Sequence, residues 1–205
     1  MLKLEADNIA KWFGERKVFE NIGFSLEPGQ SLAVIGPNGS GKTTLLRIII
    51  GLTPPTKGNI SFLRDGKSLD FNIYRKELSL VSPYLSLYGS LTACENLRFL
   101  SKVNGNDIDN TTINNVLEQV GLEGRGDDYV SEYSSGMQQR LKYAAALIKN
   151  PSVLLLDEPT ANLDDFGKKK VFDLIKTYRP DSIFIIATNE KEEYSLAESV
   201  CQLGG

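Results

Sequence analysis

Residues Gly36–Thr43 read G-P-N-G-S-G-K-T, and this stretch decides which fold the chain can adopt. Its glycines carry no Cβ, so the backbone can turn its N–H groups inward around a bound anion. The apolar run Ser31–Ile35 precedes the stretch, and Thr44–Ile50 has the length and composition of a buried helix. A strand, a glycine-rich loop and a helix in this order predict a phosphate-binding loop, whereas a glycine-rich turn that binds nothing requires no such flanks.

A nucleotide would bind along this loop and at the start of the helix. The first N–H groups of the helix and its dipole attract the α- and β-phosphates. Lys42 is placed to reach the β- and γ-phosphates, and the Thr43 hydroxyl is placed to ligate Mg²⁺. The residues that we predict to hold ATP and its Mg²⁺ here are Gly36, Pro37, Asn38, Gly39, Ser40, Gly41, Lys42, Thr43 and Thr44.

The composition is that of a globular protein. The chain has 205 residues, of which 41% are hydrophobic and 24% charged, so it can bury a good core and is not disordered. The net charge of −3 argues against a nucleic-acid partner. With two cysteines and no histidine, we expect neither a disulfide framework nor a zinc site, and we expect Cys94 and Cys201 to be buried apolar residues.

The pattern along the chain predicts an α/β fold of the P-loop NTPase type, with a single domain over residues 1–205. Its core, residues 1–83 and 151–205, has a mainly parallel sheet preceded by an N-terminal antiparallel β layer, and residues 84–150 form an inserted helical lobe. Strands are expected at Leu2–Ala10, Val18–Leu26, Ser31–Ile35, Asn59–Leu63, Leu78–Ser82 and Ser182–Ala187, and helices at Leu91–Val103, Ile108–Val120, Gly136–Lys149 and from near Leu163.

The stretch Lys11–Lys17 combines charged residues, a glycine and two aromatic residues, which predicts a loop. An exposed ring such as that of Phe13 could stack on a nucleotide base, or it could fold back onto the core. The residues alone leave both interpretations open.

A second chemical element is the run V-L-L-L-D-E-P-T at residues 153–160. Its continuous apolar part is typical of a parallel strand buried on both faces, and ligands bind at the carboxyl ends of such strands. Asp157 can hold Mg²⁺ through its water shell, and Glu158 is placed to polarise the water that attacks the γ-phosphate. We therefore predict Asp157 as a metal ligand and Glu158 as the catalytic base.

In order and over practically the whole chain, these motifs resemble those of the ATP-binding subunits of ABC transporters. Gly36–Thr43 resembles their Walker A loop, and Leu154–Glu158 resembles their Walker B motif with its catalytic glutamate. Residues 133–140, Y-S-S-G-M-Q-Q-R, resemble the signature motif that the family usually writes L-S-G-G-Q, and A-N-L-D at residues 161–164 resembles the D-loop.

The resemblance implies roles for further residues. It places Ser134, Ser135 and Gly136 against the γ-phosphate held by another subunit, and it assigns Asp164 to the nucleotide site through the D-loop. Ser134 is also the expected N-cap of a helix, which is compatible because a capped helix N-terminus attracts anions. Phe13 falls where such proteins stack an aromatic ring on adenine, which favours the stacking interpretation.

The resemblance also implies how the protein works. Such subunits form head-to-tail dimers that sandwich two ATP molecules, hydrolyse them and move a pair of membrane domains. The expected partners are a second copy or a homologous ATPase subunit, and separate transmembrane subunits, because no apolar run approaches 18 residues. We expect a cytoplasmic protein, peripheral on the inner face of the membrane through its transmembrane partner. The short chain and its S-S-G-M signature resemble exporter-type ATPases.

Two positions depart from the family pattern. The glutamine expected near position 83 is Pro83, so a Mg²⁺ ligand there must be Ser82 Oγ, a backbone carbonyl or another water. The switch histidine is replaced by Asn189, which can donate an N–H to the γ-phosphate but cannot carry charge. We expect slow hydrolysis, with Lys42, Glu158 and Asn189 as the catalytic residues. The alternative is a nucleotide-dependent dimerisation module with little or no ATP turnover.

Apolar and aromatic residues crowd the segment that follows Pro83, namely Tyr84, Leu85, Leu87 and Tyr88. This cluster has two interpretations. It is either a docking surface for a transmembrane partner or a part of the packing within the helical lobe.

Overall fold

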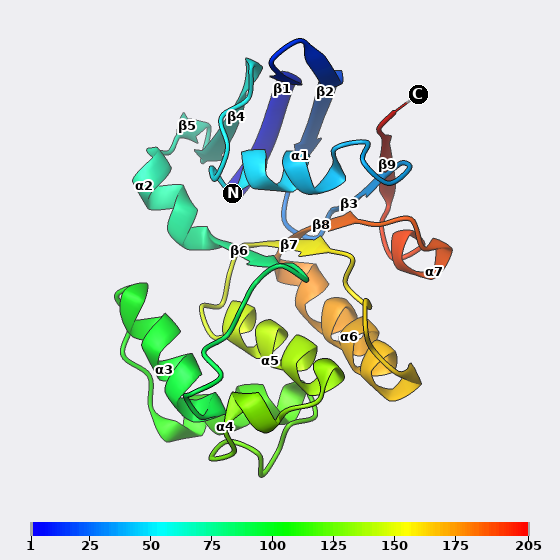
Figure 1. Ribbon diagram of the computed structural model, residues 1–205. Coiled ribbons are helices and arrows are strands. Elements are labelled where there is room, and N and C mark those ends of the chain that lie inside the picture. Colours follow the sequence, from blue (N-terminus) through cyan, green and yellow to red (C-terminus); the bar gives the residue numbers. More distant parts are fainter. Residues whose placement is uncertain (1, 205) are drawn as a thin grey trace. The chain divides into compact units, whose positions relative to one another are not determined.

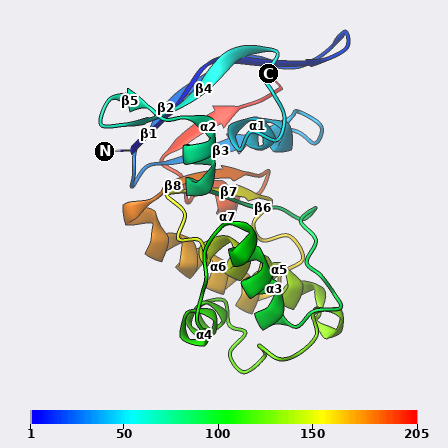
Figure 2. The same cartoon turned by 90° about the vertical axis from the view of Figure 1, so that its left-hand side faces the viewer.

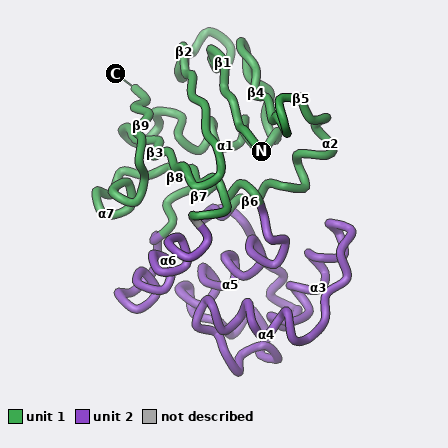
Figure 3. The backbone as a smooth tube through the Cα atoms, turned by 180° about the vertical axis from the view of Figure 1, so that it is seen from behind, with its two compact units in different colours: residues 1–80, 152–159, 179–205 green, residues 81–151, 160–178 purple. Residues whose placement is uncertain are grey.

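The computed structural model describes residues 2–204, with the backbone alone described at Arg179, and contains two compact units. Figure 3 shows them in different colours: unit 1 is residues 1–80, 152–159 and 179–205, and unit 2 is residues 81–151 and 160–178. Unit 1 contains both sheets, and unit 2 is helical. The predicted fold class is confirmed, since a parallel sheet, an antiparallel sheet and a helical part are all present.

The antiparallel sheet of unit 1 has the order β2-β1-β4-β5 (Figure 1), where the strands are β1 (Leu2–Phe13), β2 (Arg16–Leu26), β4 (Lys57–Arg64) and β5 (Lys67–Ser68). The predicted loop over residues 11–17 is wrong. Trp12 pairs with Lys17 and Phe13 with Arg16, so the two strands continue into a tight hairpin that turns at Gly14 and Glu15. Gly14 has a φ of 59°, which a two-residue hairpin turn needs and which glycine adopts without strain.

The second sheet has the order β6-β7-β8-β3-β9, with β6 (Leu78–Val81), β7 (Val153–Asp157), β8 (Ile183–Ala187), β3 (Ser31–Ile35) and β9 (Ser199–Gln202). The pairs β7/β8, β8/β3 and β3/β9 are parallel. Every residue of β7 and β8 is buried, which accounts for their continuous apolar runs. The carboxyl ends of β3, β7 and β8 therefore share one edge of the sheet.

Helix α1 (Lys42–Ile49) lies between the two sheets of unit 1, as Figure 2 shows. Its residues Leu45, Leu46 and Ile49 are fully buried in a core that also takes in side chains of β1, β3, β4 and β8. The shorter helices of unit 1 are α2 (Phe71–Tyr74), η1 (Arg75–Glu77), η3 (Arg179–Asp181) and α7 (Lys191–Tyr194). Packing on both sides holds α1, and hence the loop before it, in a fixed place.

Unit 2 contains α3 (Ala93–Val103), α4 (Asn110–Gln119), η2 (Val130–Glu132), α5 (Ser135–Leu147) and α6 (Asp165–Tyr178). Its division differs from the predicted one, because α6 groups with the inserted helices. The Arg140 guanidinium of α5 lies 5.3 Å from the Phe166 ring centre of α6, and the Tyr178 hydroxyl donates to Gln119 Oε1 at 3.1 Å. These side-chain contacts join α6 to α4 and α5, which periodicity alone does not reveal.

Two further features bear on the expectations from sequence. Cys94 and Cys201 are free thiols that are only partly buried, so the expectation that both are buried residues is wrong. Over residues 2–204, no helix has both the length and the apolar character needed to span a bilayer.

Candidate nucleotide site

The loop Gly36–Thr43 connects β3 to α1, and its backbone requires glycine at two places. Gly36 has a φ of 150°, and a Cβ there would lie 2.3 Å from the Leu203 carbonyl oxygen. Gly41 has a φ of 100°, and a Cβ there would lie 2.4 Å from Val18 Cγ1. Leu203 and Val18 therefore lie directly against the loop, and no pattern in the sequence indicated the contact with Leu203.

Lys42 is 6% exposed, and its ammonium has a protein acceptor for each of its three hydrogens. It donates to Gly36 O at 2.7 Å, to Pro37 O at 3.2 Å and to Asn189 Oδ1 at 3.0 Å. These contacts fix the ammonium beside the loop, where a phosphate oxygen can replace one of the three acceptors.

Thr43 and Asp157 meet although 114 positions separate them in the sequence. The Thr43 hydroxyl lies 3.0 Å from both carboxylate oxygens of Asp157, which is buried at the end of β7. A hydroxyl beside a carboxylate is a set of oxygen ligands that suits Mg²⁺. Within residues 2–204 no three His, Cys, Asp or Glu side chains form a metal cage, so an ion here would need phosphate or water oxygens as well.

Glu158 follows β7 with a φ of 48°, a left-handed conformation that is costly for a residue with a Cβ. Its N–H donates to Ala187 O at 2.9 Å, which ties this turn to the end of β8. The side chain is exposed to solvent. The structure thus holds a carboxylate within reach of water, one residue beyond the buried Asp157.

Two features of the loop suit a phosphate. Ser40 Oγ is buried and has no hydrogen-bond partner in the part of the chain that the structure describes. Gly41 is the N-cap of α1, and among residues 2–204 no side chain caps its first N–H groups. Unpaired donors at a helix N-terminus fit an anion, because the helix dipole favours negative charge there.

Phe13 lies at the end of β1 beside the hairpin turn, and the residue is 56% exposed. The interpretation that the ring folds back onto the core is therefore wrong. Lys11 Nζ donates to Pro54 O at 2.8 Å and lies 4.9 Å from the centre of the Phe13 ring. The lysine thus makes a cation–π contact with the ring. Stacking of the ring on adenine stays a prediction.

Asn189 follows β8 and completes the group of predicted residues in unit 1. Its Nδ2 donates to Asn38 Oδ1 at 2.8 Å, while its Oδ1 accepts from Lys42. Sequence reasoning selected all three residues but did not connect Asn38 with Asn189, which lie 151 positions apart.

The remaining predicted residues belong to unit 2, where Ser82, Ser134 and Asp164 each accept a backbone N–H of a neighbouring residue. Ser134 Oγ accepts the Met137 N–H at 3.2 Å as the N-cap of α5, and Asp164 Oδ1 accepts the Gly167 N–H at 2.8 Å at the start of α6. Ser82 Oγ accepts the Tyr84 N–H at 3.4 Å. Ser135, which follows the N-cap residue Ser134, is exposed. Contacts of Ser82, Ser134, Ser135, Gly136 and Asp164 with a nucleotide stay predictions.

The residues that resemble the signature motif and the D-loop lie beside each other in unit 2. A Cβ on Gly136 would lie 3.5 Å from Asn162 O and 3.9 Å from Leu163 Cδ2. Tyr133, where the family usually has leucine, donates its hydroxyl to Arg125 O at 2.7 Å. Burial, together with the charge of Asp128, raises the pKa of Tyr133 to about 12, so the hydroxyl remains a donor at neutral pH.

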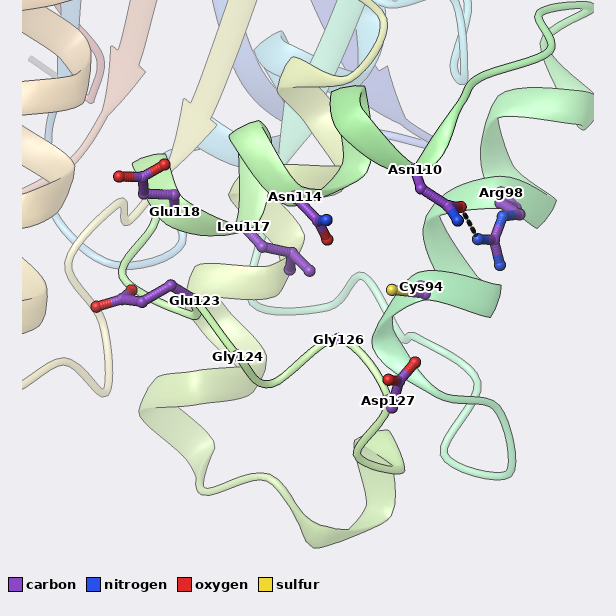
Figure 4. A pocket seen from close by; sticks show the side chains of 10 residues that line it. All are labelled: Cys94, Arg98, Asn110, Asn114, Leu117, Glu118, Glu123, Gly124, Gly126 and Asp127. Atoms are coloured by element: carbon purple, nitrogen blue, oxygen red, sulfur yellow. Dashed lines mark hydrogen bonds between the residues drawn. The ribbon is translucent and has the colours of Figure 1, made fainter.

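Unit 2 also holds a cavity of about 350 Å³ between α3, α4 and the loop at residues 123–127 (Figure 4). Arg98 on its wall donates to Asn110 Oδ1, and Cys94 lies on the same side. Burial, with the Asp127 carboxylate adding to it, raises the pKa of the Cys94 thiol. The cavity contains none of the predicted nucleotide residues, and its thiol is not activated as a nucleophile.

The chain is similar to proteins whose family is known. The family model described as ABC transporter matches residues 19–161. The linearmycin resistance ATP-binding protein LnrL of Bacillus subtilis is 33% identical over 192 residues, which are 93% of this chain and 62% of that protein. The spermidine/putrescine import ATP-binding protein PotA of Spiroplasma citri is 37% identical over 195 residues, 93% of this chain and 55% of that protein. The chain thus spans less than two thirds of either relative.

A solved structure agrees over a larger share of its length. It is a dimeric post-hydrolysis state of an ATP-binding cassette with ADP and Pi bound, and its TM-score to this chain is 0.84 at 26% sequence identity. The match covers 98% of this chain and 94% of that one.

Proposed function

This chain belongs to the ABC transporter family as one of its ATP-binding proteins, and on that premise we propose that it hydrolyses ATP to power transport by separate membrane subunits. The observation that carries the proposal is the contact of Thr43 with both Asp157 oxygens at 3.0 Å. A loop that merely turned would not need a buried carboxylate from another strand beside its hydroxyl.

Four residues of unit 1, Lys42, Thr43, Asp157 and Glu158, have roles in this reaction. A water oxygen bonds to the γ-phosphorus while the bond from that phosphorus to the β,γ-bridging oxygen breaks, which yields ADP and inorganic phosphate. Glu158 orients the water and accepts its proton, and Lys42 stabilises the charge on the phosphate oxygens. When bound, Mg²⁺ supplies further positive charge at those oxygens, and Thr43 and Asp157 are the residues to hold it.

A second copy, or a homologous ATPase subunit, would complete each nucleotide site. Ser134, Ser135 and Gly136 at the start of α5, together with Asp164, would then contact the γ-phosphate held by the partner. Support comes from the exposure of both serines and from the dimeric state of the similar solved structure. The dimer would be attached to the inner face of the membrane by its transmembrane subunits.

Substitution of the base tests this proposal. Glu158→Gln is expected to keep ATP binding and to abolish phosphate release, because the amide cannot accept the proton of water. The stalled protein should be a dimer by size-exclusion chromatography with light scattering in saturating ATP, and a monomer without nucleotide. Glu190→Gln, a nearby exposed glutamate, is the control and should hydrolyse ATP like the native chain. A Glu158→Gln variant that remains monomeric with ATP and the membrane subunit would contradict the sandwich.

One observation favours the alternative of a nucleotide-dependent dimerisation module. Asn189 engages Lys42 and Asn38 through a neutral amide, where a histidine could have exchanged a proton. Multiple-turnover phosphate release separates the two functions. If the native chain turns over and Asn189→Ala slows it on the order of 10- to 100-fold, Asn189 positions phosphate in an ATPase. If only Asn189→His turns over, the chain is a binding module.

A further inference from the structure

Three polar side chains in the phosphate loop region form one continuous chain of hydrogen bonds. The Lys42 ammonium donates to Asn189 Oδ1 at 3.0 Å, and Asn189 Nδ2 donates to Asn38 Oδ1 at 2.8 Å. Asn38 and Lys42 lie in the same loop, so Asn189 is held from two sides of that loop.

The direction of this chain is determined by chemistry. A lysine ammonium has only donors, so the atom of Asn189 that faces it must be the amide oxygen. The Asn189 NH₂ group must then face Asn38, and Asn38 must present its own oxygen. Turning over either amide would set a donor against a donor, so Lys42 dictates both orientations.

The two ends of the chain are anchored independently. Lys42 also donates to the carbonyls of Gly36 and Pro37, which keeps its ammonium in place. The backbone on either side of Asn189 is held by Thr188, whose N–H donates to Val34 O at 3.1 Å and whose Oγ1 accepts the Glu190 N–H at 2.9 Å. What stays adjustable is the side chain of Asn189, where Lys42 holds the amide oxygen and Asn38 restrains the NH₂ group.

We propose that Asn38 is a positioning residue, which holds the Asn189 amide so that its oxygen stays on Lys42 and its second N–H remains available to the γ-phosphate. The role rests on the proposed ATPase function of this site. Within residues 2–204 the second N–H of Asn189 has no hydrogen-bond acceptor, as a donor to a phosphate requires. Asn38 acts through Asn189, so its effect should vanish once Asn189 is removed.

Side-chain amide resonances test the orientation without any turnover. In protein labelled with ¹⁵N-asparagine, the Asn189 NH₂ pair is identified as the pair lost in Asn189→Ala. In Asn38→Ala this pair should move toward the shifts of a solvent-exposed asparagine, because its acceptor is gone. In Asn38→Asp, which keeps an oxygen in the same place, the pair should stay near its native position. An unchanged pair in Asn38→Ala overturns the proposal.

A double-mutant cycle tests the consequence for catalysis. Asn38→Ala should lower kcat about 3- to 10-fold, as expected for one hydrogen bond, with the KM for ATP within about twofold of native. In the Asn189→Ala background the same substitution should change kcat less than about twofold. Independent effects that multiply, or a rise in KM alone, would show that Asn38 acts on the nucleotide directly and would overturn the proposal. If the native chain does not hydrolyse ATP, the proposed function fails, and the resonances still decide the role of Asn38.

Discussion

Individual residues determine the shape of the phosphate loop. Gly36 and Gly39 both have positive φ, 150° and 81°, yet their surroundings differ. A Cβ on Gly36 would lie 2.3 Å from Leu203 O and 2.7 Å from Ser40 Oγ, whereas a Cβ on Gly39 would meet no atom within 4 Å. The two positions form a matched pair that separates backbone strain from a steric clash.

Gly36→Ala should therefore destabilise the protein more than Gly39→Ala. The left-handed backbone alone costs roughly 1–2 kcal/mol in the free energy of unfolding for an L-residue, which is the expected effect at Gly39. The clash at Gly36 should add about 1–3 kcal/mol, because a backbone carbonyl cannot move aside as a side chain can. Urea unfolding of both variants measures the difference, and equal loss at the two sites would rule out the close approach of Leu203.

Between elements, one carboxylate in unit 1 connects the two sheets. Glu77 in η1 accepts from the Arg64 side chain of β4 at 3.0 Å and from the Ser152 hydroxyl just before β7. Burial alone would raise the pKa of Glu77, but the hydrogen bonds from Ser152 and Arg64 outweigh it and lower the pKa below the ordinary value of 4.5. The charged carboxylate is thus the form that the fold favours.

This lowered pKa predicts a pH-dependent contribution to stability. Because the folded-state pKa lies below the unfolded-state pKa, the contribution is complete above about pH 4.5 and is lost as the pH falls through the folded-state value. Glu77→Gln should lower the urea midpoint at pH 7, and the gap to the native chain should narrow below pH 4.5. Glu15→Gln, in the exposed hairpin turn, controls for the loss of one negative charge. A gap that is constant over this pH range would contradict the assignment.

At the scale of the whole molecule, apolar and aromatic side chains gather on the surface after Pro83. Tyr84 is 74% exposed, and Leu85 and Tyr88 are exposed as well, whereas Leu87 is partly buried, so packing inside unit 2 accounts for only part of this cluster. Tyr88 stands edge-on to Phe99 of α3 with the ring centres 5.2 Å apart, which extends the apolar surface onto that helix. We propose this surface as the docking site for the transmembrane subunit.

Replacing the exposed rings tests the docking site. The double variant Tyr84→Ser, Tyr88→Ser should lose co-purification of the transmembrane subunit while it keeps ATP binding, because the substitutions remove apolar contact area outside unit 1. Tyr129→Ser, another half-exposed tyrosine of unit 2, is the matched control and should keep the partner. Loss of ATP binding in the double variant would show that the two rings support the fold instead.

The sequence by itself determined those features of this protein that neighbouring residues encode. Such features are the order of apolar strand, glycine-rich loop and helix around Gly36–Thr43, and the run of four apolar residues in β7 before Asp157. These features can be predicted from the sequence because backbone preference and hydrophobic periodicity act over a few residues. The sequence predicted a loop at residues 11–17, where the structure has a hairpin, because strand pairing depends on the partner strand and not on local composition.

Only the tertiary structure decided which distant side chains meet. Thr43 reaches Asp157 because β3 and β7 both pair with β8 in parallel, so their carboxyl ends share one sheet edge. The same edge brings Asn189 onto Lys42 and ties Glu158, in its left-handed turn, to Ala187. These contacts depend on strand order and on packing between residues far apart in the sequence, 114 positions for Thr43 and Asp157 and 147 for Lys42 and Asn189, and no local pattern in the sequence carries that information.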